Sequence, residues 1–160
     1  MLKLRAVRGK GMPSRRELIR MSDQEVADFL ARQRKVHVAT INRDGSPHLM
    51  PMYFVLVDGA VAFWTYTKSQ KIRNLQRDPR ITVMAEDGEG YFDLRGVQIN
   101  GRAKLTTDPV AVLEFGERLY ERQFGFLGEA ARASVASSAP KRTCVTVEPV
   151  RVVSWDHTRL

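Results

Sequence analysis

Two Asp-Gly pairs constrain the fold of this chain more than any other feature of its sequence. Asp44-Gly45 separates a β-rich run at Val36–Asn42 from a second one at Pro47–Val57. Asp58-Gly59 then separates the second run from the apolar, β-branched segment Val61–Thr65. An Asp-Gly pair between two such runs is a strong hairpin signal, because these residues tolerate the positive φ that tight turns need. The sequence therefore predicts two successive hairpins, which make a meander of three antiparallel strands.

Capping and turn signals place the other predicted elements. Two capping boxes, at Ser14–Glu17 and Ser22–Glu25, predict helix starts, and the second helix is expected to end near Gln33. Asp108-Pro109 predicts another helix, which continues to about Phe124. The remaining predictions are a strand at Ile81–Glu86, a long β stretch at Tyr91–Thr106 broken by Gly96 and Gly101, a short helix around Glu129–Ser137, and a last strand at Thr143–Trp155 broken at Pro149.

About six strands with helices between some of them fit a mainly β fold of the α+β class. Glycine bends inside the long β stretch and the two tight hairpins favour a small closed or split antiparallel barrel over a parallel sheet. The expected architecture is a six-stranded antiparallel barrel with flanking helices.

The stretch Ala60–Leu75 passes from a predicted buried strand directly into a short helix. Ile72 and Leu75 lie at helical spacing, Ser69 stands at the N-cap position, and Lys71 lies in the first turn. The helix dipole favours an anion at this end, so a lysine is a poor match. A bound phosphate would relieve the mismatch, because it pairs with the lysine and with the first-turn N–H groups. A solvated lysine on a connecting helix explains the stretch equally well.

The length of 160 residues fits one domain with a proper core, and the formal net charge is +8. Residues 1–21 carry seven Lys and Arg residues against one acidic residue, so most of the excess lies in an N-terminal arm. We therefore divide the chain into a basic arm with some helical content at 1–21 and a single domain at 22–160. The arm lacks interleaved aromatic residues for base stacking, which makes a nucleic-acid partner unlikely.

Several classes of site and location are disfavoured by the sequence. Cys144 is the single cysteine, so neither an intrachain disulfide nor a cysteine-based metal site is expected. His37, His48 and His157 are too dispersed to make a metal site. The sequence contains no apolar run long enough to span a membrane and no signal-peptide pattern, so a cytoplasmic location is expected.

Four segments together resemble a known superfamily. They are A-T-I-N-R-D-G-S-P-H at Ala39–His48, the run W-T-Y-T-K-S-Q-K-I-R-N-L-Q-R-D-P-R at Trp64–Arg80, N-G-R-A at Asn100–Ala103, and E-P-V-R-V-V-S-W at Glu148–Trp155. Their order and spacing resemble the flavin-binding split-barrel superfamily typified by pyridoxamine 5′-phosphate oxidase. Within it, the chain is most similar to the branch that uses the deazaflavin coenzyme F-420. The resemblance implies a homodimer with two cofactor sites at the subunit interface.

The resemblance also implies positions for the cofactor. Lys71 would hold its phosphate, helped by Ser69, Gln70 and Asn74. The ring system would be lined by a second group of residues, largely through their backbone: His48, Met50, Pro51 and Met52, with Trp64 and Thr65 beside them and Trp155 approaching from the partner subunit. Members that use flavin mononucleotide (FMN) often have an arginine where Gln70 stands, so F-420 is favoured over FMN.

The implied activity is hydride transfer from reduced F-420 to a small unsaturated or carbonyl-bearing substrate. The cofactor carries the hydride, and the protein supplies orientation and electrostatics. Water, Tyr66 or His48 would supply the proton. Two alternatives stay open: an FMN-dependent enzyme like pyridoxamine 5′-phosphate oxidase, and a non-catalytic carrier of a flavin, a deazaflavin or haem.

Overall fold

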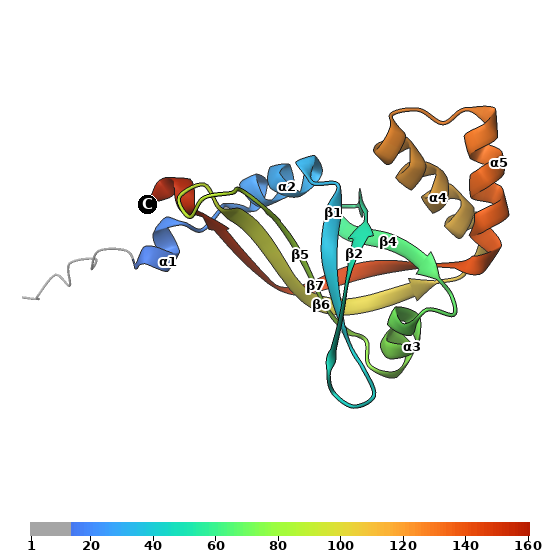
Figure 1. Cartoon of the computed structure of the whole chain (residues 1–160), viewed down its shortest axis with the longest axis horizontal. Helices are drawn as coiled ribbons and strands as arrows, with labels where there is room; N and C mark the ends of the chain where they lie inside the picture. The colour runs from blue at the N-terminus through green and yellow to red at the C-terminus, as the bar shows by residue number, and fades with distance from the viewer. Residues whose placement is uncertain (1–13) are drawn as a thin grey trace, which may run out of the picture.

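The structure, a computed structural model, describes residues 14–160 and is built on one antiparallel sheet (Figure 1). The sheet has seven strands in the order β2-β1-β5-β6-β7-β4-β3. Their bounds are β1 Lys35–Ile41, β2 Pro47–Tyr53, β3 Val55–Val57, β4 Ala60–Tyr66, β5 Arg80–Asp87, β6 Arg95–Thr106 and β7 Arg142–Asp156.

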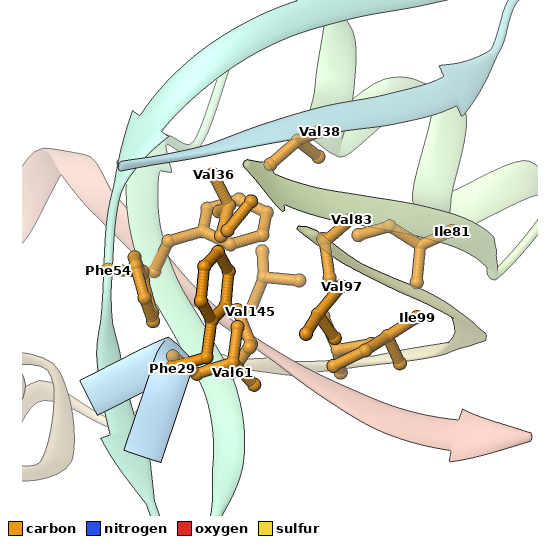
Figure 2. Close-up of a cluster of buried hydrophobic side chains, with 14 of the residues drawn as sticks. Phe29, Val36, Val38, Phe54, Val61, Ile81, Val83, Val97, Ile99 and Val145 are labelled. Atoms are coloured by element: carbon orange, nitrogen blue, oxygen red, sulfur yellow. The ribbon is translucent and has the colours of Figure 1, made fainter. Parts of the chain in front are cut away.

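Phe54 decides the shape of this sheet. It is the single residue between β2 and β3, although these strands lie at opposite edges of the strand order. The sheet must therefore curl until its two edges meet at Phe54, which is fully buried (Figure 2). The result is a split barrel: its edges are joined at Phe54, and within residues 14–160 the rest of β2 has no second partner strand.

The predicted barrel with flanking helices is thus confirmed, with seven strands rather than six. The extra strand arises because Pro47–Val57 is interrupted at Phe54. The expected three-stranded meander is wrong for the same reason: β2 pairs with β1, and β3 pairs with β4. Both hairpins form. Gly45 has φ 84°, and Asp58 and Gly59 have φ 50° and 79°.

The long strands β6 and β7 confirm some expectations and correct others. β6 begins at Arg95 rather than at Tyr91, and β7 continues past Pro149 as one strand. The predicted irregularities at Gly101 and Pro149 coincide, because the register between β6 and β7 shifts where these two residues pair and leaves Val150 without a partner in β6. Gly101 is required there because an added Cβ would lie 2.4 Å from the carbonyl oxygen of Glu148. Gly96, in contrast, pairs regularly with Trp155.

The helices close the two ends of the barrel and one outer face. They are α1 Arg15–Leu18, α2 Asp23–Arg32, α3 Gln70–Arg77, α4 Pro109–Phe124 and α5 Glu129–Ser138, with short 3₁₀ turns η1 Ala139–Lys141 and η2 His157–Arg159. Figure 1 shows α2 and α3 at opposite ends of the barrel and the α4–α5 pair to one side. Both capping boxes form as predicted, at Ser14 and Ser22. The part of the basic arm before residue 14 lies outside the described residues.

Two apolar clusters lie on the two faces of β4. Val61 and Phe63 face the barrel interior, where they join Phe29 of α2, Phe54 and Ile72 of α3 (Figure 2). The intervening Ala62 and Trp64 face outwards and pack against α4, whose contacts come from Val112, Phe115 and Leu119. β4 is therefore covered on both sides, which explains why Val61–Trp64 are apolar without alternation.

We expect Phe54→Ala to lower the free energy of unfolding by about 3–5 kcal/mol, because it leaves a cavity where the sheet edges meet. Chemical denaturation measures this loss. Phe126→Ala is the matched control, since Phe126 is 67% exposed and its truncation should change the free energy by less than about 0.5 kcal/mol. Equal losses in the two variants would contradict the role given to Phe54.

Candidate functional site

The site is built around the start of α3. β4 ends at Tyr66, and after a short turn the Ser69 hydroxyl accepts the Ile72 N–H at 3.5 Å as the N-cap of α3. The Thr65 hydroxyl lies 3.5 Å from the same oxygen. The first-turn N–H groups of α3 therefore lie directly beyond the end of the barrel strand.

Lys71 is buried in the first turn of this helix, with 8% of its surface exposed. Within residues 14–160, no carboxylate lies within ion-pair distance of its ammonium group. Burial lowers the pKa of Lys71 from its ordinary value. The side chain of Lys71 is mostly buried, and its partly desolvated ammonium has no counter-ion among these residues, so a bound anion would stabilise it. Of the two interpretations of Lys71, burial favours the anion site over the solvated lysine.

A network of amide side chains fixes α3 against β1. Asn74 is fully buried, and its Nδ2 donates to Thr40 Oγ1 at 3.0 Å and to Asn42 Oδ1 at 2.9 Å. Its Oδ1 accepts from Gln70 Nε2 at 2.9 Å. Both amide hydrogens of Asn74 are thus used, so a contact from them to a cofactor phosphate would break a protein hydrogen bond. Asn74 holds the helix that carries Lys71.

His48 and Gln70 line an open cavity next to this helix, together with Asn42, Arg43 and Asp44. The Nδ1 of His48 is buried and has no hydrogen-bond partner in the part of the chain that the structure describes. The Asp44 carboxylate accepts from the Ser46 hydroxyl at 2.6 Å and from its N–H at 3.0 Å, which holds the pKa of Asp44 below its usual range. The cavity therefore combines a cation, Arg43, with a carboxylate that is already bonded, while the Nδ1 of His48 is buried.

The other residues predicted to line the ring lie on β2, an edge strand. His48, Met50 and Met52 stand opposite Thr40, Val38 and Val36, so they share the face turned to the barrel interior. Pro51 is on the opposite face with Leu49 and Tyr53.

β2 also carries backbone groups along the edge that faces away from β1. Proline in an edge strand turns its nitrogen away from the ladder. The nitrogens of Pro47 and Pro51 therefore face away from β1. Backbone groups alternate in direction along a strand, so the N–H groups of Leu49 and Tyr53 face the same way. These N–H groups are available to a ligand, and the sequence reasoning had omitted both residues.

Three of the predicted site residues have side chains that do not lie beside those of Thr65 and Lys71. They are Trp64, Tyr66 and Trp155. Trp64 faces α4, where an added Cβ on Gly116 would lie 2.5 Å from its ring. Tyr66 stacks against the Arg142 guanidinium, whose carbon lies 3.7 Å from the ring centroid.

Trp155 lies over Gly96 at the C-terminal end of β7, across the molecule from α3 (Figure 1). Within one chain, Trp155 is therefore not brought to the site.

The described residues also lack two other kinds of feature. No group of three metal-ligating side chains lies together in residues 14–160. No helix in this range has both the length and the apolar character needed to cross a membrane.

Comparison with solved structures supports the same fold. The protein Rv2991 of Mycobacterium tuberculosis, described as a conserved hypothetical protein, is 38% identical, with a TM-score of 0.85 over 92% of each chain. A structure described as an F420 reductase is 25% identical, with a TM-score of 0.64 over 78% of this chain and 93% of its own. HutZ of Vibrio cholerae, described as a haem storage protein, is 14% identical, with a TM-score of 0.65 over 82% and 94% of the two chains.

Among curated proteins, no sequence matches this chain. The family model for pyridoxamine 5′-phosphate oxidase, in contrast, matches residues 22–156, nearly the whole of the described chain. With the curled antiparallel sheet and the buried lysine at the start of α3, this match shows that the chain belongs to the pyridoxamine 5′-phosphate oxidase family of split-barrel proteins.

Proposed function

We propose that this protein is an oxidoreductase that binds the deazaflavin coenzyme F-420 and transfers a hydride to a small unsaturated or carbonyl-bearing organic substrate. The observation that carries the proposal is the buried Lys71 without a carboxylate partner among residues 14–160. The similarity to a structure described as an F420 reductase supports the choice of cofactor.

The start of α3 fits the phosphate of such a cofactor. Lys71 offers a charge with no competing acid, and the first turn of α3 offers N–H groups and the positive end of the helix dipole. Ser69 caps the helix, and Asn74 ties it to β1, so these groups are held in place before a ligand binds. The free edge of β2 offers backbone N–H and C=O groups to the ring system.

The bound cofactor supplies a hydride, and the residues of this chain supply its surroundings. A hydride and a proton add across the double bond of the substrate, so the protein must admit a proton donor. His48 suits that role better than Tyr66, because its side chain lines the cavity beside α3. Tyr66 instead lies against Arg142.

FMN is the alternative cofactor, and its phosphate would use the same lysine. Gln70 favours F-420, since it supplies no second cation and its amide donates to Asn74. A non-catalytic carrier would bind the cofactor equally well, but it would show no turnover across a panel of acceptors.

We expect Lys71→Met to raise the dissociation constant for F-420 by about tenfold to a hundredfold, because a hydrogen bond to a charged group contributes about 1.5–3 kcal/mol. The free energy of unfolding should change by less than about 1 kcal/mol, since the variant keeps an apolar side chain in the buried position and removes a charge that forms no ion pair among residues 14–160. Calorimetric titration and chemical denaturation measure the two effects.

Lys68→Met is the matched control, because Lys68 is an exposed lysine three residues away. It should change the affinity by less than about fivefold. An unchanged dissociation constant in Lys71→Met would remove Lys71 from the site.

We further propose that the protein is a homodimer in which Trp155 reaches the site of the partner subunit. The outer face of the sheet supports this proposal, because Leu49 and Val150 are 61% and 75% exposed there. A hollow next to Val150 is lined by Ala39, Ile41 and Pro47 together with the cations Arg80 and Arg102. An exposed apolar surface of this kind marks a contact with another molecule.

Sedimentation velocity at micromolar concentration should show a dimer. Val150→Asp should shift the protein towards the monomer, because it places a charge in the apolar face. Phe126→Asp, an exposed position on the α4–α5 loop, should leave the dimer intact. A wild-type monomer that still binds the cofactor tightly would refute the dimer.

A further inference from the structure

A second cavity, of about 470 Å³, lies between the barrel and α4. Four aromatic side chains form its walls: Tyr53 at the end of β2, Trp64 on β4, and Tyr120 and Phe124 on α4. The rings of Tyr120 and Phe124 contact each other with their centroids 4.4 Å apart and their planes tilted by 41°. A planar, largely apolar ligand matches such walls, because its faces bury area against the rings.

The charged side chains that line this cavity are all basic. Arg34 and Lys35 lie in its lining, and no acidic residue does so in the part of the chain that the structure describes. The side-chain Nε2 of Gln123 is buried and lacks a hydrogen-bond partner among residues 14–160. A buried donor without a partner costs about 1–3 kcal/mol, so a ligand acceptor atom would satisfy it.

The wall of the cavity is fixed before any ligand binds. An Arg122 Nη donates to three backbone carbonyls at the end of α2, those of Leu30, Ala31 and Gln33, at 2.8–3.4 Å. An Arg34 Nη donates to the Gln123 carbonyl at 2.9 Å. These bonds tie the C-terminal end of α4 to the end of α2 and to Arg34, next to the start of β1, so the cavity is a preformed site rather than a gap between mobile elements.

We propose that this cavity binds a planar aromatic carboxylate, with the ring among the aromatic walls and the carboxylate facing Gln123, Arg34 and Lys35. That this ligand is the hydride acceptor rests on the proposed function. β2 links the two places, because Tyr53 lies five residues from His48, or roughly 17 Å at about 3.3 Å per residue.

The test uses 4-nitrobenzoate as the probe and 4-nitrobenzyl alcohol as its neutral counterpart, titrated by calorimetry into the full-length protein without cofactor. We expect the carboxylate to bind at least tenfold more tightly than the alcohol. Gln123→Leu should weaken the carboxylate about tenfold and the alcohol far less. Lys35→Gln, at an exposed position, should weaken the carboxylate about twofold to fivefold, with the difference vanishing at 1 M salt.

A second measurement locates the probe. Trp64 and Trp155 are the two tryptophans of the chain, so Trp155→Phe leaves Trp64 as the single indole. Binding of 4-nitrobenzoate should quench its fluorescence with the same dissociation constant that calorimetry gives. Equal affinity for the acid and the alcohol, no effect of both Gln123→Leu and Lys35→Gln, or no quenching of Trp64 would each overturn the proposal.

The cavity proposal and the cofactor proposal can be refuted independently of each other. Lys71→Met should lose F-420 affinity and keep affinity for 4-nitrobenzoate, because Lys71 does not line this cavity. If F-420 binds while 4-nitrobenzoate does not, the cavity proposal is wrong and the cofactor proposal stands. If 4-nitrobenzoate binds with the expected variant effects while F-420 does not, the cofactor proposal is wrong and the cavity remains a binding site.

Discussion

The closure of the sheet at Phe54 is the constraint on which the rest of the structure depends. β2 and β3 follow one another in the chain and lie at opposite edges of the sheet, so the sheet curls and leaves β2 with a free edge. That free edge, the end of β4 and the start of α3 meet at the open part of the barrel. A mostly apolar barrel thereby carries the free edge of β2, the side chain of His48 and the first turn of α3 with Lys71.

Lys71 carries a charge that has no counter-ion among residues 14–160. Burial of its side chain disfavours the charged form, and the amide network of Asn74 holds α3 in the position that buries it. Proteins keep such unfavourable groups at places where a ligand compensates for them. The helix that closes the core, α3, therefore also fixes a cation where a phosphate can reach it.

Local chemistry explains what was predictable from the sequence. Both hairpins followed from Asp-Gly turns, and the helix ends followed from Ser22 and Asp108, because these signals act within a few residues. The interruption at Phe54 was not predictable, since it depends on which sheet edges meet.

The burial of Lys71 could not be predicted from the sequence either, because it depends on how α3 packs on β1, about thirty residues earlier in the chain. The aromatic cavity was missed for a similar reason: Trp64 reads as a core or cofactor residue until α4 packs against it at Gly116.

The most direct test of the account is a side-by-side titration of the full-length protein, freed of cofactor, with F-420 and with FMN. F-420 carries carboxylates beyond its phosphate, and the protein has a net charge of +8, so the account predicts tighter binding of F-420 and a difference that shrinks as salt rises. Tighter binding of FMN, or binding of neither cofactor, would contradict the account.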